Sequence, residues 1–419
     1  MQCSLANNDN NLVWQSYAMM QANNNPLMVR SAQGVYLTLC DGRSMIDGIS
    51  SWWTTCHGHA HPHIIDKVKQ QLEQVPHVMF AGLAHESVYE LSKKLTKILP
   101  KTIEHFVYCE SGSVAVEIAL KIALQYCSNK ALSRRKFVYF ENGYHGDTIG
   151  CGIVTDDNTI IHRFAKNNKN CIKSKLPQNK QELADFDRLI SNNKDQIAAI
   201  IIEPVFQGAG GMKFYPAETL SEIYKITKKH GLLFIADEIA TGFYRTGKYF
   251  ACNHADITPD IICLGKGITS GIIPFAVVGA TEEVFDSFYS SNPAHALKHG
   301  STFAANPLGC IAAIGSIELF EKEPRAQQVS EISDQLRHEL MPLLKLPQVK
   351  DIRVLGAIGV VELECSYQDI CTMRNIIRGK NVWLRPFSNV IYTMPPFITS
   401  EREISTITKT IEETLMEVF

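Results

Sequence analysis

Short, almost continuous apolar runs alternate with longer amphipathic stretches through the middle of the chain, and this alternation restricts the possible folds most strongly. Such runs read as strands buried on both faces, and they lie at residues 105–109, 136–140, 198–202, 232–236 and 261–265. A strand without a polar face needs helices on both sides of its sheet. The pattern therefore predicts an α/β fold built on a mostly parallel sheet.

The last third of the chain has a different pattern, with an amphipathic helix expected over residues 325–344 and a final helix from about Glu401. Strands are expected between them, over residues 351–363, 382–387 and 390–396. We predict three parts: an N-terminal segment (1–50) that packs with the small domain, a large domain (51–305), and a small C-terminal α+β domain (306–419).

Composition excludes several functional classes. The 41 basic and 43 acidic side chains give a formal net charge of −2, and no basic stripe is present, so we expect no nucleic-acid or membrane partner. The N-terminus lacks an apolar signal region, and the longest apolar runs are too short to cross a bilayer. The 12 cysteines form no CxxC pair and mostly stand singly in apolar segments, which favours reduced thiols and a cytoplasmic protein.

Three polar groups follow predicted strands, at the edge where α/β sheets bind ligands. Gly112 and Ser113 follow the 105–109 strand and open a helix expected to end near Gln125, so their amides could hold a phosphate. Asp237 follows the 232–236 strand, and Lys266 follows the 261–265 strand, where loss of water lowers the amine pKa. Each feature alone has an ordinary structural explanation as a cap, a buried carboxylate or a surface lysine. Together, and in this order, they are the contacts that hold pyridoxal 5′-phosphate.

Longer motifs surround these residues and cover almost the whole chain. They are GLLFIADEIATGFYRTGKYFA (231–251), PDIICLGKGITSG (259–271), IIEPVFQGAGG (201–211), GYHGDT (143–148) and HGSTFAANPLGC (299–310). With them the sequence resembles the class III, fold-type I aminotransferases. The resemblance implies a large domain with a seven-stranded, mostly parallel sheet, a smaller α+β domain, pyridoxal phosphate as cofactor, and a homodimer whose site is shared between subunits.

The resemblance also implies roles for individual residues, with no metal among the ligands. Catalysis is assigned to Lys266, Asp237 and Tyr17. The expected cofactor-binding residues are Gly112, Ser113, Tyr144, Asp237, Lys266, Ser301 and Thr302, with Thr302 arriving from the partner subunit. The expected substrate-binding residues are Trp52, Trp53, Tyr17, Tyr144, Asp147, Lys266, Gly300, Arg385 and Tyr392. Because neighbouring residues of a strand point to opposite faces, we expect only one tryptophan, Trp52, to face the substrate directly.

One position bears on the substrate. Relatives that use glutamate or ornithine often place an arginine two residues before an xPP turn, whereas this chain has Tyr392 there. A tyrosine tolerates the sulfonium cation of S-adenosylmethionine better than an arginine does. The resemblance then implies amino transfer from S-adenosylmethionine to 8-amino-7-oxononanoate, in biotin biosynthesis, with Arg385 on the carboxylate of the oxo acid.

Three other functions remain open from the sequence. The chain could be another class III aminotransferase acting on ornithine, GABA or an ω-amino acid, or a class III mutase or epimerase. The run CHGHAHPH (56–63) also allows a metal-binding protein, because a strand would place the alternating His57, His59, His61 and His63 on one face. However, class III enzymes commonly write a turn here as GHxHP, so we expect structural histidines near the dimer interface. Two departures from the family pattern, WQSY (14–17) and Ser301 in place of proline, put loop rigidity near Tyr17 and Thr302 in doubt.

Overall fold

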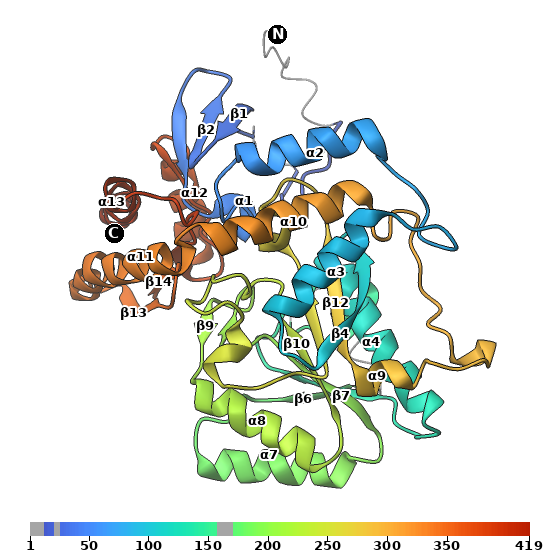
Figure 1. Cartoon of the computed structure of the whole chain (residues 1–419). Helices are drawn as coiled ribbons and strands as arrows, with labels where there is room; N and C mark the ends of the chain where they lie inside the picture. The colour runs from blue at the N-terminus through green and yellow to red at the C-terminus, as the bar shows by residue number, and fades with distance from the viewer. Residues whose placement is uncertain (1–11, 21–25, 157–170) are drawn as a thin grey trace.

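A seven-stranded sheet forms the centre of the molecule (Figure 1). The computed structural model describes residues 12–20, 26–156 and 171–419. In spatial order the strands are β4 (Ile103–Cys109), β12 (Ala276–Thr281), β11 (Ile261–Leu264), β10 (Leu233–Asp237), β7 (Ile197–Ile202), β5 (Lys136–Phe140) and β6 (Cys171–Ser174). All run parallel except β12, which is antiparallel to both of its neighbours. The predicted α/β class and mostly parallel sheet are therefore confirmed.

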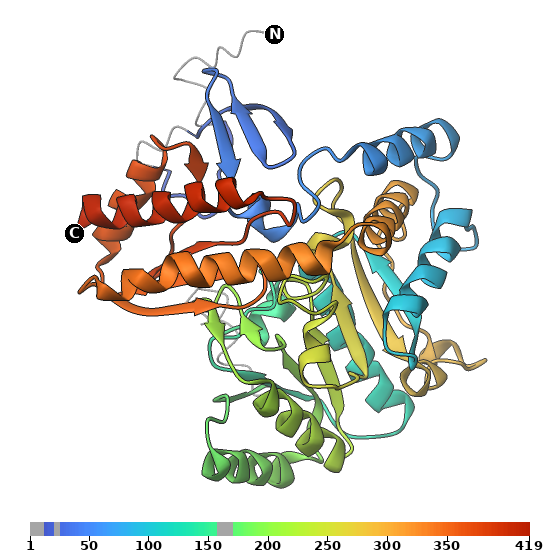
Figure 2. The same ribbon diagram turned by 60° about the vertical axis from the view of Figure 1, so that its left-hand side comes forward.

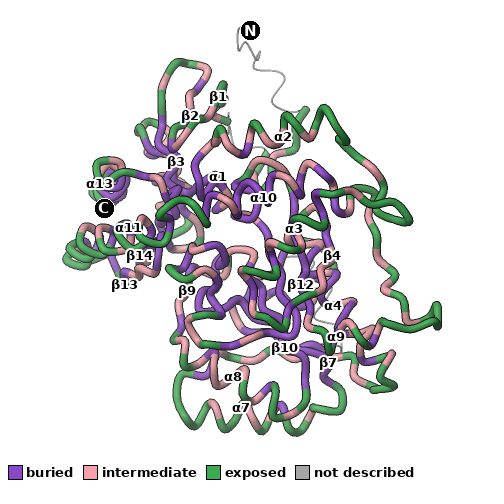
Figure 3. The backbone as a smooth tube through the Cα atoms, in the orientation of Figure 1, coloured by how far each residue is buried: buried purple, intermediate pink, exposed green. Residues whose placement is uncertain are grey.

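Helices cover both faces of this sheet, as fully apolar strands require. Helix α4 (Gly112–Asn129) packs its alanine-rich face on one side, where Ala119 lies in a cluster with Ile201 of β7. On the other side, α7 (Lys180–Asn193) and α8 (Ala217–Lys229) cover strand residues such as Phe234. Figure 3 shows the resulting layers, with buried strands inside and the outer sides of α7 and α8 exposed.

A second group of helices lies beyond the strand β4. Helix α10 (Pro307–Lys322) packs against α2 (Pro62–Gln74) and α3 (Glu86–Ile98) and then leads into α11 (Arg325–Leu340). Figure 2 shows α11 lengthwise and α10, to which it is joined, almost end-on, so the direction of the chain changes between the two helices. The division at residues 305 and 306 stays a prediction. It assigns α10 to the small domain, although this helix lies on two helices of the large one.

The C-terminal part forms a three-stranded antiparallel sheet in the order β13 (Val349–Val354), β14 (Gly359–Leu363) and β16 (Val390–Thr393). Helices α11, α12 (Tyr367–Ile377) and α13 (Glu401–Val418) complete it. The N-terminal strands β1 (Val29–Gln33), β2 (Tyr36–Leu39) and β3 (Ser44–Asp47) join β15 (Val382–Trp383), which pairs parallel with β3. The N-terminal residues thus share a sheet with C-terminal ones.

Two expected strands of this part are wrong in extent. Residues 351–363 form a hairpin rather than one strand, because the chain reverses at Gly356, whose φ of +55° suits glycine. Of residues 382–387, only β15 (Val382–Trp383) forms a strand. Pro386 has no backbone N–H that could donate to a neighbouring strand.

Two further expectations concern membranes and thiols. Among the described residues, no helix is long and apolar enough to cross a membrane. Ten described cysteines are free, and seven of these ten are buried, in line with expectation. Cys40 departs from it, because it is disulfide-bonded.

Candidate active site

The site lies where the carboxyl ends of β4, β5, β7, β10 and β11 meet at one edge of the sheet. Asp237 is the last residue of β10, and Lys266 follows β11, which is the neighbouring parallel strand. The helix α4 begins directly after β4. The three groups predicted from strand ends therefore share this edge, as parallel strand order requires.

Asp237 is a buried carboxylate with a fixed orientation. Its Oδ2 lies 2.8 Å from Nδ1 of His145, and its Oδ1 accepts the backbone N–H of Ile239 at 3.1 Å. Both Asp237 and His145 are buried. The sequence motif GYHGDT contains His145, but no role was predicted for it. His145 and Asp237 are 92 residues apart in the sequence, so their contact depends on how the loop packs against the end of β10.

Lys266 sits in a tight turn rather than in a strand. It opens the 3₁₀ segment Lys266–Thr269 with a φ of +45°, a left-handed conformation that is strained for a side chain. Its Nζ lies 4.6 Å from the ring centroid of Trp53. Burial lowers the pKa of this amine, while the charges of Asp237 and Glu203 oppose that shift. A lowered pKa provides the neutral amine that Schiff-base chemistry needs.

The start of α4 suits a phosphate. Ser111 caps the helix, since its Oγ accepts the N–H of Val114 at 3.3 Å. Within the described chain, the amides of Gly112 and Ser113, here called the phosphate cup, have no protein acceptor. A β-carbon at Gly112 would lie 2.9 Å from Ile239, so the position also admits no larger residue without a shift. Unpaired amides at a helix N-terminus bind anions, which fits the phosphate predicted there.

The loop that carries Tyr144 closes over this region. Gly146 has a φ of +119°, and a β-carbon there would come within 2.2 Å of Ser113 Oγ. Ser113 Oγ accepts the backbone N–H of Asp147 at 3.3 Å, which holds the loop against the phosphate cup. Tyr17 Oη donates to Asp147 Oδ2 at 2.5 Å. Burial, and then a hydrogen bond with Tyr17, raise the pKa of the Tyr144 hydroxyl, so this group stays protonated.

A buried carboxyl that the sequence analysis did not assign lies beneath this loop. Glu203 follows β7, and its two oxygens accept the backbone N–H groups of Tyr144 and Gly208, both at 3.0 Å. Burial raises the Glu203 pKa to about 7. Glu203 lies in the IIEPVFQGAGG motif (201–211). However, a glutamate before a proline does not by itself indicate which backbone amides will donate to it.

The two tryptophans do not lie on a strand, so the premise used to choose between them was wrong. Residues 50–53 form a left-handed turn in which Trp52 and Trp53 have φ values of 69° and 74°. Trp53 is buried and contacts the Lys266 amine, whereas Trp52 is 43% exposed. The Arg385 guanidinium lies 4.7 Å from the Trp52 ring centroid, and Tyr17 meets the same ring edge-on.

Tyr392 lies deeper than a residue facing a bound cation would. It is buried, and its hydroxyl accepts the indole N–H of Trp53 at 3.2 Å. Arg385, in contrast, is partly exposed, and no described carboxylate pairs with it. Burial and the nearby Arg374 lower the Arg385 pKa, so this cation lies in a positive environment that an anion would stabilise.

Gly300, Ser301 and Thr302 lie on a segment next to α4. Ser301 Oγ donates to Glu110, which precedes the phosphate cup. His299 contacts Lys121 of α4 at 3.2 Å. Thr302 itself is exposed. The phosphate contact predicted for Thr302 of the partner subunit stays a prediction.

Three of the four alternating histidines contact different partners, and the Nδ1 of His61 is buried without a hydrogen-bond partner among the described residues. His57 Nε2 lies 3.1 Å from the Ser316 carbonyl, and its Nδ1 accepts the Arg325 Nε–H at 3.0 Å. His59 meets Asp47, and His63 meets Glu318. No group of three or more metal-ligating side chains occurs among the residues that the structure describes. These four contacts, made by His57, His59 and His63, are structural, which supports the turn interpretation.

Comparison with known proteins gives one consistent result. A profile described as "Aminotransferase class-III" matches residues 17–415. Adenosylmethionine-8-amino-7-oxononanoate aminotransferase of Buchnera aphidicola subsp. Schizaphis graminum is 38% identical over 97% of this chain and 96% of that protein. The protein of the same name from Corynebacterium glutamicum is 39% identical over 96% of both.

Solved structures agree with these sequence relatives. The crystal structure of the enzyme of that name from Methanocaldococcus jannaschii has a TM-score of 0.94 and 31% identity, and covers 98% of both chains. An amine transaminase from an uncultivated Pseudomonas species, solved with PLP bound, has a TM-score of 0.90 and 27% identity over 97% of this chain and 99% of that chain.

Proposed function

Because the chain belongs to the class III aminotransferases, we propose that it transfers an amino group from S-adenosylmethionine to 8-amino-7-oxononanoate in biotin biosynthesis. The observation that carries the aminotransferase chemistry is the placement of Asp237 and Lys266 at the carboxyl ends of adjacent parallel strands. The full-length similarity to relatives that bear this enzyme's name supports the choice of substrates.

Pyridoxal 5′-phosphate is the proposed cofactor, and class III aminotransferases depend on it. The free amides of Gly112 and Ser113 suit its phosphate, Asp237 suits its ring nitrogen, and the Lys266 amine suits its aldehyde. When bound, the cofactor supplies an electron-withdrawing ring that stabilises negative charge on a substrate carbon. Of these three contacts, the carboxylate is the most rigid, because His145 and the Ile239 amide fix both of its oxygens.

The residues around that position have separate tasks in our proposal. The Lys266 amine takes the proton from the donor α-carbon and returns one in the second half of the cycle. Trp53 covers the amine on one side and keeps water from it. Tyr17, Tyr144 and Asp147 form one hydrogen-bonded group beside it, and Asp147 brings the negative charge that a cationic donor requires.

Arg385 is the proposed carboxylate contact of the oxo acid. It lies beside the exposed Trp52 ring and has no carboxylate partner among the described residues. A guanidinium binds a carboxylate through two parallel hydrogen bonds. Tyr392 is buried behind Trp53 and carries no charge. An arginine at this position would place a second positive charge there and repel a cationic donor.

We also propose that the protein is a cytoplasmic homodimer. Large apolar side chains are exposed on the 75–85 segment and at Phe303: Met79 (54%), Phe80 (40%), Leu83 (55%) and Phe303 (51%). His77 lies against the Phe303 ring, so these residues form one surface, here called the apolar patch. Exposed apolar patches of this kind often mark protein–protein interfaces. Thr302 adjoins it, which suits delivery of Thr302 of the partner subunit to the phosphate.

The decisive experiment follows the visible absorbance of the purified protein during separate additions of S-adenosylmethionine and glutamate. We expect a band from Lys266-bound cofactor that bleaches only with S-adenosylmethionine. Bleaching with glutamate alone would keep the aminotransferase chemistry and refute the proposed donor. A protein with stoichiometric zinc and no band would contradict the proposed cofactor.

A further inference from the structure

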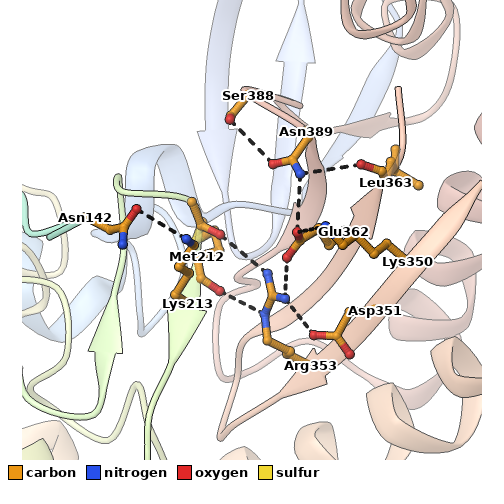
Figure 4. Close-up of polar contacts among 11 residues, drawn as sticks. Asn142, Met212, Lys213, Lys350, Asp351, Arg353, Glu362, Leu363, Ser388 and Asn389 are labelled. Carbon is orange, nitrogen blue, oxygen red and sulfur yellow. Dashed lines mark hydrogen bonds and ion pairs between the residues drawn. The ribbon is translucent and has the colours of Figure 1, made fainter. Parts of the chain in front are cut away.

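A polar contact joins the C-terminal sheet to a glycine-rich turn of the large domain (Figure 4). The turn, residues 208–213, runs from the end of β8 (Phe206–Gln207) into the first residue of β9 (Lys213–Phe214) and is called the glycine turn here. Arg353 of β13 donates from Nε to the Met212 carbonyl at 3.1 Å and from Nη2 to the Gly211 carbonyl at 3.4 Å. Only 15% of its side chain is exposed.

Two carboxylates hold the same guanidinium from the C-terminal side. Nη1 of Arg353 lies 2.6 Å from both Asp351 and Glu362, on β13 and β14. Glu362, whose side chain is 17% exposed, holds the guanidinium in its own sheet more firmly than Asp351, which is 50% exposed. The remaining N–H donors of Arg353 then fix the position of the glycine turn. A lysine could not reproduce this, because it lacks the planar fork.

The other side of the glycine turn contacts the loop that leads to Tyr144. Lys213 Nζ donates to Asn142 Oδ1 at 3.2 Å, and Gln207 donates to the Glu141 carbonyl at 2.7 Å. Gly210 packs so closely that a β-carbon there would lie 1.7 Å from the Asn142 carbonyl oxygen. A shift of the turn therefore forces a shift of the loop.

The turn also reaches the substrate side of the site. A β-carbon on Gly208 would lie 3.0 Å from the Trp53 ring, and Trp53 contacts the Lys266 amine. Glu203 accepts from the amides of Gly208 and Tyr144 together, which ties the turn and the loop into one unit.

We propose that Arg353 is a positioning residue, which places Tyr144 and Trp53 by holding the glycine turn from the C-terminal sheet. This rests on the proposed function, because its readouts use pyridoxal phosphate and an amino donor. In this proposal the C-terminal sheet helps to shape the active site through Arg353, although Arg353 itself contacts neither substrate nor cofactor.

The test compares the holoenzyme with Arg353→Gln. We expect the Kd for pyridoxal phosphate to rise about tenfold and the donor KM to rise several-fold, while kcat changes less than about threefold. The circular dichroism of the bound-cofactor band should weaken, since that signal depends on how the ring is held. Arg353→Lys should recover only part of the loss.

Asp351→Asn is the matched control, because the Asp351 side chain is 50% exposed and the less exposed Glu362 (17%) still holds the guanidinium when Asp351 is changed. Lys213→Met tests the far end of the connection with an exposed side chain, and serves if Arg353→Gln does not fold. We expect Asp351→Asn to keep the wild-type Kd and KM. Lys213→Met should change both constants in the same direction as Arg353→Gln. In the double variant Arg353→Gln/Lys213→Met, the loss of binding free energy should be smaller than the sum of the two single losses.

Wild-type Kd and KM in Arg353→Gln, or in Lys213→Met if that variant alone folds, would overturn the proposal. Equal shifts in Asp351→Asn would overturn it too, since they would show a general loss of stability. Failure of the wild-type chain to bind pyridoxal phosphate would instead contradict the proposed function, and this inference with it.

Discussion

At the scale of single residues, the site combines groups whose properties come from burial. Lys266 has a lowered amine pKa, Glu203 has a raised carboxyl pKa, and the Asp237 carboxylate is fixed by two contacts. Loss of water disfavours the charged form in each of the first two cases. The same low-water environment strengthens the hydrogen bonds that hold Asp237.

Lys266→Ala should abolish amino transfer, since no other described amine lies over Trp53 to move the proton. We expect a loss of at least about 10³-fold in turnover, and no visible band from covalently held cofactor. Steady-state assays with S-adenosylmethionine and an absorbance spectrum check this. Lys248→Ala, at an exposed lysine, is the control and should behave as wild type. Substantial activity in Lys266→Ala would refute the assignment.

Glu203 should make the stability of the ligand-free chain depend on pH. Its folded pKa is about 7, against an ordinary value of 4.5, so the folded state binds the proton more tightly than the unfolded state. The stabilisation is complete below about pH 4.5 and is lost as the pH rises to about 7. The free energy of unfolding of wild type, relative to Glu203→Gln, should fall over that window by up to about 3 kcal/mol. Denaturant titrations at several pH values measure it, and parallel curves would show that Glu203 does not titrate there.

At the scale of elements, the site depends on how closely two loops approach. The loop after β5 carries Tyr144, and the glycine turn after β8 lies against it with no room for a side chain at Gly210. Glycines make this approach possible through size, and at Gly146 also through a positive φ. Chain folding places both loops, because β5 and β7 are neighbours in the sheet.

Gly210→Ala should displace the Tyr144 loop, since the new methyl group would overlap the Asn142 carbonyl oxygen. We expect pyridoxal phosphate to bind at least about tenfold more weakly, with a loss of stability of about 1–3 kcal/mol. Fluorescence titration of the cofactor and denaturant unfolding test both effects. Gly379→Ala is the control, at an exposed glycine with no tight neighbour and no positive φ. Unchanged cofactor affinity in Gly210→Ala would argue against the close approach.

At the scale of the whole molecule, distant parts of the chain depend on each other. The C-terminal sheet contacts the glycine turn, and the N-terminal strands share a sheet with β15. The apolar patch is the surface that we propose for contact with a second copy. No part of the site is therefore independent of the rest of the fold.

Leu83→Asp should weaken the proposed homodimer, because burial of a charge in an apolar interface is costly. We expect monomers by sedimentation at micromolar concentration, together with weaker cofactor binding if Thr302 of the partner subunit contacts the phosphate. Met416→Asp replaces an apolar residue outside the patch that is more exposed (68%) than Leu83 (55%), and should leave the oligomeric state unchanged. A wild-type chain that sediments as a monomer would refute the dimer.

The sequence by itself determined the class of the sheet, five of its seven strands and the three strand-end groups, because periodicity and chain order are local properties that survive folding. It did not predict β12 or β6. Phosphate cup, Asp237 and Lys266 were predicted from single strands, and the parallel sheet then brought their ends together. The GYHGDT and IIEPVFQGAGG motifs marked the segments of His145 and Glu203 without their roles. Those roles are contacts with Asp237 and with the Tyr144 amide, across 92 and 59 residues.

Only the tertiary structure decided the rest. It placed Trp53 rather than Trp52 on the Lys266 amine, because residues 50–53 turn left-handed where the sequence suggested a strand. It buried Tyr392 behind an indole, and it gave three of the alternating histidines three unrelated partners. Long-range contacts of this kind depend on how loops pack on finished elements, and no periodicity encodes that packing.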